Sequence, residues 1–184
     1  MLPILVVLAS CIYQLTYAQV PELNRTKYLG RWYQIYADLA VDLTFENSSY
    51  CVTADYGVYP NDTVSVLNRE RQYSITGPER DIYGWADVSN ASQPAELTVH
   101  LQTTNFPAPY WVFQLGPDTH EGYKYEYAIV SDPLKFTLFV LARNVTDFMD
   151  RFNTNVTYWL KTNGFTELWN LPILTTQEGC KYWD

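Results

Sequence analysis

Short runs in which apolar and polar residues alternate occupy most of the chain. A period of two is typical of β-strands that bury one face. Turn-forming clusters separate the runs, and the short connections favour antiparallel neighbours. The predicted strands cover residues 30–37, 50–59, 63–69, 72–76, 82–88, 96–102, 110–115, 123–130 and 136–143.

The period changes after the last predicted strand. Between residues 147 and 164 the apolar positions recur every three or four residues, which predicts one amphipathic helix. Thr146 is the expected N-cap and Gly164 the expected end of this helix. Its apolar stripe, which we expect to pack on the outside of the sheet, consists of Phe148, Phe152, Val156, Trp159 and Leu160.

A long antiparallel meander can hide its edge strands in two ways, by closing into a barrel or by folding as a sandwich. Phe, Trp and Tyr make up 16% of the chain, so an aromatic interior or lining is expected. An eight-stranded barrel has just enough interior for one small ligand.

The N-terminus predicts export. Residues 2–18 carry no charge, are too short to span a bilayer and end in Thr16-Tyr17-Ala18. We therefore expect a secretory signal peptide at 1–18, one domain at 19–184, and an extracellular location. The alternative for this segment is a buried N-terminal helix.

Two further observations agree with an oxidising compartment. Cys11 would leave with the signal, so Cys51 and Cys180 remain and are expected to pair. Six glycosylation sequons predict a glycoprotein with sugars at Asn24, Asn47, Asn61, Asn90, Asn144 and Asn155. The sequon at Asn155 is the weakest, because it flanks the apolar stripe.

The formal net charge of −8 disfavours a nucleic-acid partner, because phosphate binding needs a basic surface. We interpret the acidity as an aid to solubility. No metal-ligand pattern or cofactor motif is recognised.

One group of motifs is specific. Residues 28–35, Tyr-Leu-Gly-Arg-Trp-Tyr-Gln-Ile, resemble the Gly-x-Trp motif that opens the first strand of the lipocalins. The segments at 45–56, 64–70 and 108–112 resemble later strands of the branch that contains apolipoprotein D and the bacterial lipocalins. Tyr127-Ala128-Ile129-Val130 and Leu141-Ala142-Arg143-Asn144 occupy the places of the second and third motifs.

This resemblance implies an all-β fold: an eight-stranded antiparallel up-and-down β-barrel, the lipocalin calyx, with one C-terminal α-helix packed outside. It also implies three residues that close the barrel. Gly30 permits a sharp turn, Trp32 fills the narrow end, and Arg143 lies over the indole as a cation–π partner. Cys51 and Cys180 match a bridge between the second strand and the C-terminal tail, whereas the N-terminal cysteine pair of that branch is absent.

Alternation along the strands and the resemblance together predict the ligand pocket. Val64, Val66 and Asn68 should face inward because Arg69 must face solvent, and 82, 84, 86, 97, 99 and 101 should also face the lumen. The expected ligand-binding residues are Tyr56, Val66, Asn68, Val99, Tyr110, Phe139 and Leu141. The alternative is a solid core without a cavity.

The resulting hypothesis is a secreted carrier of a fatty acid, sterol, retinoid or tetrapyrrole-like molecule, not an enzyme. Lipocalin-type isomerases use a reactive lumen cysteine, and both mature cysteines are expected in a bridge. His100 and His120 form no catalytic or metal-binding pattern. A third hypothesis is an interaction module with an incidental pocket, in which Phe106 at the open mouth contacts a membrane or receptor transiently. We favour the alternative, in which the Phe106 loop is a lid over the ligand. In either case a monomer or weak dimer is expected.

Overall fold

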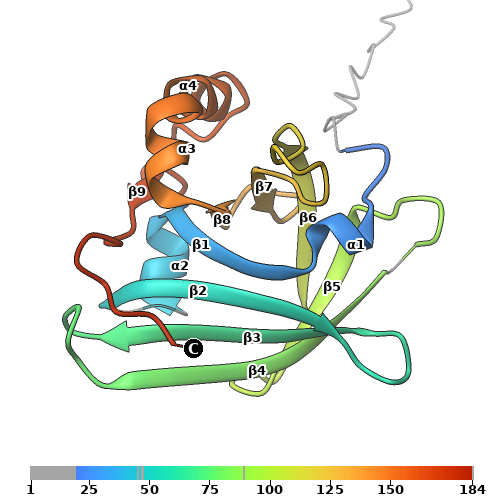
Figure 1. The fold of residues 1–184 in the computed structure, drawn as a ribbon, viewed down its shortest axis with the longest axis horizontal. Helices are drawn as coiled ribbons and strands as arrows, with labels where there is room; N and C mark the ends of the chain where they lie inside the picture. Colours follow the sequence, from blue (N-terminus) through green and yellow to red (C-terminus); the bar gives the residue numbers. More distant parts are fainter. Residues whose placement is uncertain (1–19, 45, 47, 89, 184) are drawn as a thin grey trace, which may run out of the picture.

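The computed structural model describes residues 20–44, 46, 48–88 and 90–183, so the expected signal peptide at 1–18 lies outside the described residues. Strands β2 to β8 pair antiparallel in chain order, and β1 pairs with both β8 and β2. The sheet therefore closes into the predicted barrel (Figure 1). Its strands are β1 (Gly30–Ala37), β2 (Ser49–Val58), β3 (Val64–Gln72), β4 (Glu79–Val88), β5 (Glu96–Leu101), β6 (Ala108–Leu115), β7 (Tyr127–Ser131) and β8 (Leu138–Ala142).

Two short helices and a short strand were not predicted. Helix α1 (Arg25–Tyr28) lies at one end of the barrel and α2 (Leu39–Thr44) at the other (Figure 1). Strand β9 (Ile173–Leu174) pairs with the end of β1. Each element is six residues long or shorter, so it contains too few positions for a period to be recognised.

The prediction of two separate strands at 63–69 and 72–76 is wrong. A single strand, β3, runs to Gln72 and turns back through Ser74 and Gly77. The charged residues between the two predicted runs belong to the strand, and Glu70 pairs with Arg80 at 2.7 Å across the β3–β4 ladder. The predicted strand at 123–130 also begins later, at Tyr127. Before it, Asp118 and Tyr125 form only an isolated bridge.

The C-terminal helix is two helices, α3 (Val145–Arg151) and α4 (Asn153–Thr162), which meet at Phe152. Thr146 is not the N-cap: the Asn144 side chain accepts the Asp147 N–H at 3.0 Å, so α3 starts earlier. The stripe is as expected. Phe148, Val156 and Leu160 are buried against the outer face of β1, β7 and β8.

The C-terminal tail crosses the outside of the barrel and is anchored by the predicted Cys51–Cys180 disulfide, which the structure confirms. Nearby, the Gln177 amide donates to the backbone carbonyls of Gln34 and Val52 at 2.8 and 2.9 Å. The tail therefore joins β1 to β2, two strands that close the sheet.

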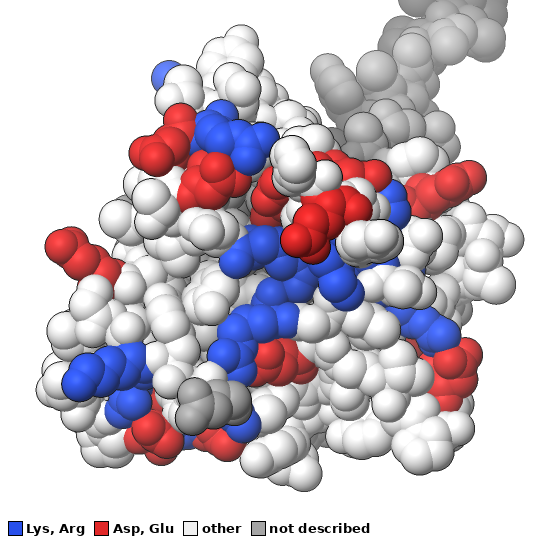
Figure 2. All heavy atoms as spheres, viewed as in Figure 1, with Lys and Arg blue, Asp and Glu red and all other residues white. Residues whose placement is uncertain are grey.

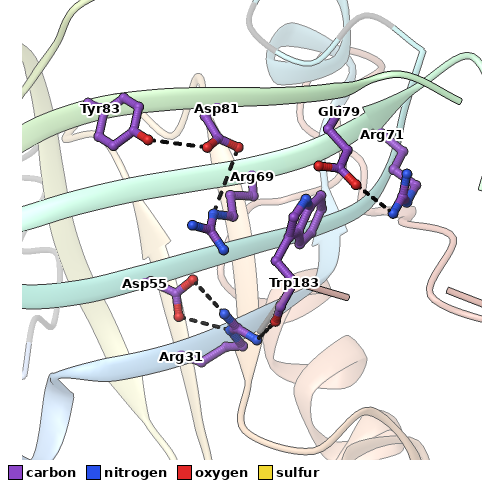
Figure 3. Close-up of polar contacts among 8 residues, drawn as sticks. All are labelled: Arg31, Asp55, Arg69, Arg71, Glu79, Asp81, Tyr83 and Trp183. Atoms are coloured by element: carbon purple, nitrogen blue, oxygen red, sulfur yellow. Dashed lines mark hydrogen bonds and ion pairs between the residues drawn. The ribbon is translucent and has the colours of Figure 1, made fainter. Parts of the chain in front are cut away.

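Charged residues hold the end of the tail on β1, β2 and β3. Figure 2 shows Lys and Arg side chains on this face as a band beside Asp and Glu side chains. In Figure 3, Arg31 contacts both Asp55 oxygens and donates to the Trp183 carbonyl at 2.7 Å. The guanidiniums of Arg69 and Arg71 lie 5.9 and 5.5 Å from the Trp183 ring centroid.

Replacing both bridge cysteines by serine should lower the free energy of unfolding by about 2–5 kcal/mol, because the bridge closes a long loop in the unfolded chain. The sequence separation is 129 residues. Urea unfolding of the variant and the oxidised parent measures the difference. Trp183→Ala, which keeps the bridge, is the control and should cost less. An unchanged unfolding midpoint in the cysteine variant would contradict this role of the tail.

Candidate functional site

The barrel encloses a cavity of about 920 Å³, so its interior is not solid. The wall is mainly aliphatic and aromatic, and it takes inward positions from β2, β3, β4, β5, β6 and β8. All seven predicted ligand-binding residues lie on this wall: Tyr56, Val66, Asn68, Val99, Tyr110, Phe139 and Leu141. Val64, Ile82, Ala86, Leu97 and Leu101 join them, as the alternation indicated. That these residues bind a ligand stays a prediction.

Trp32 and Arg143 close one end of the barrel. Trp32 is fully buried, and the Arg143 guanidinium carbon lies 3.5 Å from the centroid of its ring. Gly30 begins β1 with a φ of +97°, and an added Cβ would lie 3.6 Å from Arg143. At positive φ a side chain is strained, so glycine suits this turn.

The motif did not indicate how many backbone groups Arg143 binds. Its guanidinium donates to five backbone carbonyls, those of Lys27, Tyr28, Leu29, Arg31 and Tyr125. Burial lowers the pKa of Arg143 to about 10, so it remains charged at neutral pH. Among the described residues no carboxylate forms an ion pair with it. Arg143 is not on the cavity wall itself, so it places a positive charge behind the floor of the cavity, where backbone carbonyls and the Trp32 ring are its partners.

Three tyrosines form a hydroxyl cluster above this floor. The Tyr110 hydroxyl lies 2.7 Å from that of Tyr28 and 3.0 Å from that of Tyr56. Tyr28 also packs on Trp32, with 5.2 Å between ring centroids, and stacks on Tyr56. Sequence reasoning selected Tyr56 and Tyr110 but missed Tyr28, because it lies in the unpredicted helix α1.

Burial raises the pKa of Tyr56 to about 12 and the pKa values of Tyr28 and Tyr110 well above their ordinary value. The three phenols therefore stay protonated and can donate hydrogen bonds at physiological pH.

The opposite end of the cavity has acidic and exposed apolar residues. Phe106 and Leu134, each 80% exposed, lie on two loops that border the cavity, and Phe136 is also exposed. Phe106 was named from the sequence, but Leu134 and Phe136 were not. Phe136 was expected to begin the last strand, which starts at Leu138 in the structure. Phe106 projects into solvent here and lies at the rim.

Glu46 and Glu70 line the cavity near this rim, beside the Gln34 side chain. The Gln34 amide donates to a Glu46 oxygen at 2.5 Å. Burial, reinforced by the neighbouring Glu70 and Asp42, raises the pKa of Glu46 to about 8. Glu70 is compensated by Arg80. Near pH 7 Glu46 is therefore protonated and Glu70 is paired, so these two side chains add no net charge to the rim.

The remaining candidate residues lie outside the cavity. Five sequon asparagines are exposed: Asn24, Asn61, Asn90, Asn144 and Asn155. Asn47 lies outside the described residues. His100 stacks on Trp85 on the outer face and lies 3.2 Å from Asp87, whereas His120 is in an exposed loop. Within the described residues, no helix has the length and hydrophobicity that crossing a bilayer requires.

Comparison with known proteins finds a family match and several relatives of the same kind. The lipocalin-like domain family matches residues 23–167. Apolipoprotein D of Macaca fascicularis is 33% identical over 79% of this chain and 77% of its own length. The mouse protein is 38% identical, but the match spans 55% of this chain and about half, 49%, of the mouse protein. The outer membrane lipoprotein Blc of Vibrio cholerae is 33% identical over 72% of this chain and 74% of its own.

Solved structures show the same fold. Insecticyanin of the tobacco hornworm Manduca sexta superposes with a TM-score of 0.62 at 19% identity, over 90% of this chain and 87% of that one. Lobster apocrustacyanin A1 gives a TM-score of 0.60 at 16% identity, over 85% and 81%.

The raised pKa of Glu46 predicts a fall in stability with increasing pH. The folded chain keeps a proton that the unfolded chain loses near pH 4.5, so this contribution is complete below pH 4.5 and is lost as pH rises through about 8. Glu46→Gln should therefore unfold like the parent at pH 4 and be more stable at pH 8, on the order of 1–2 kcal/mol. Urea unfolding at both pH values provides the test. Equal stabilities at pH 8 would show that Glu46 ionises freely.

Proposed function

Since this chain belongs to the lipocalin family, we propose that it is a secreted binding and transport protein that holds a small hydrophobic ligand inside the barrel. Members of the family are generally binders of such ligands and typically not enzymes. The observation that carries the proposal is the 920 Å³ cavity with a largely apolar wall. Burial of ligand surface there would contribute about 25 cal/mol per Å² before ordering costs.

The ligand class is an apolar molecule with few polar groups, such as a fatty acid, sterol, retinoid or tetrapyrrole-like compound. Hydroxyl and amide groups of Tyr56, Tyr110 and Asn68 are among the polar groups on a mainly apolar wall. A few polar groups in such a wall fix ligand orientation. Catalysis by a lumen thiol has no support, because both cysteines of the described chain form the disulfide.

A second candidate function is contact with an apolar surface through the rim. Phe106, Leu134 and Phe136 are exposed beside the cavity opening. We propose that this rim touches a membrane or receptor transiently while ligand enters or leaves, as an addition to the carrier function.

Filling the cavity should remove binding. Ala86 and Val99 are direct partners in the β4–β5 register and both line the cavity, so Ala86→Trp/Val99→Trp would put two indoles side by side in the lumen. Affinity for a fluorescent apolar probe should fall at least tenfold, about 1.4 kcal/mol. Thr98→Trp, on the opposite face of β5, is the control and should bind like the parent. If the parent shows no saturable binding across a lipid panel, the carrier proposal is wrong.

Export predicts a defined mature protein. When the full chain is expressed in eukaryotic cells, the product in the medium should begin at Gln19 and lose mass on treatment with an N-glycosidase. Intact-mass spectrometry before and after treatment measures both. Retention inside the cell with residues 1–18 attached would contradict the extracellular assignment.

A further inference from the structure

We propose that the hydroxyl cluster of Tyr28, Tyr56 and Tyr110 is an anchoring subsite for a hydrogen-bond acceptor on the ligand, and that an apolar carboxylate binds with its head toward the closed end. This inference rests on the carrier function proposed above. It adds the chemistry of the ligand head and its orientation, which an apolar wall alone leaves open.

The tyrosine cluster has more hydroxyl protons than hydrogen bonds. Three phenols carry three O–H protons, and two hydrogen bonds connect them. Within the described residues these hydroxyls make no other hydrogen bond. At least one O–H therefore has no protein acceptor, whichever way the two bonds run. Tyr28 is buried and Tyr56 and Tyr110 are half-buried on the cavity wall, so a ligand that displaces water there must supply an acceptor or leave a donor unpaired.

The three tyrosine rings are held in place at the closed end of the cavity. All three tyrosines contribute to the cavity wall, yet they come from α1, β2 and β6. The stack of Tyr28 on Tyr56, with 8° between ring planes, and the near-perpendicular contact of Tyr56 with Tyr110 fix the rings. The free donor is thus held rigidly at the floor, beside Trp32, and it needs no rearrangement to meet a ligand.

The two ends of the cavity differ in charge. The buried charge of Arg143 lies directly behind the cluster, on the face of Trp32, without a carboxylate partner among the described residues. The other end of the cavity has Glu46 and Glu70 on its wall. A carboxylate at the rim would meet the protonated Glu46 and the Glu70–Arg80 ion pair, whereas at the floor it would meet a hydroxyl donor and the positive field of Arg143. The same field disfavours an amine head at the floor.

Matched ligands test the head-group chemistry. With delipidated protein, myristate should bind at least tenfold more tightly than tetradecylamine, which has the same chain length and the opposite charge. Tyr110→Phe removes the central hydroxyl. It should lower the affinity for myristate about tenfold, which corresponds to about 1.4 kcal/mol, and change the affinity for tetradecylamine by no more than about twofold. Tyr56→Phe is the second variant in case Tyr110→Phe folds poorly. Tyr83→Phe, on the outer face of the barrel, is the control and should change neither affinity.

Brominated chains test the orientation in the unmodified protein. Trp32 lies 5.2 Å from Tyr28 between ring centroids, at the floor. Myristate brominated next to the carboxyl should therefore quench tryptophan emission more than myristate brominated at the methyl end. Stronger quenching by the methyl-end bromine, or equal affinities for acid and amine that Tyr110→Phe does not change, would overturn the head-down proposal while leaving the carrier function intact. Absence of binding by every ligand would instead overturn the carrier function itself.

Discussion

Strand β1 pairs with both β2 and β8, and this double pairing closes the sheet into a barrel. Once the sheet is closed, alternate residues of every strand must face one interior, and an eight-stranded barrel leaves room there for a ligand. The closure is reinforced from outside. The tail bonds to β1 and β2 through Gln177 and is tied to β2 by the disulfide. Helices α3 and α4 cover the β1, β7 and β8 side.

Closure also gives the cavity two chemically different ends. Behind the floor, the Arg143 guanidinium is surrounded by backbone carbonyls and the face of Trp32. The tyrosine hydroxyl cluster lies between this charge and the lumen. At the rim, Glu46 and Glu70 stand beside exposed apolar loops. A ligand with one polar end should therefore bind with a different free energy in each of its two orientations. Most of its surface would contact the same apolar wall in both.

Much of this arrangement could be predicted from local pattern. Alternation placed Val66 and Val99 on the inner face, and the Gly-x-Trp motif identified Trp32. The errors came where tertiary contacts override pattern. Charged residues at 69–71 continue β3 because Glu70 meets Arg80 on the next strand. Tyr28 was missed because α1 has only four residues, and its role depends on oxygens from β2 and β6. No single-strand pattern contains such a three-element contact.

Native mass spectrometry of protein secreted from cells shows whether the closed barrel retains a small apolar molecule. We expect a species heavier than the glycan-free chain by the mass of one small molecule, which denaturation releases into an organic extract. A native mass equal to that of the denatured chain, both before and after incubation with lipid extract, would contradict this expectation.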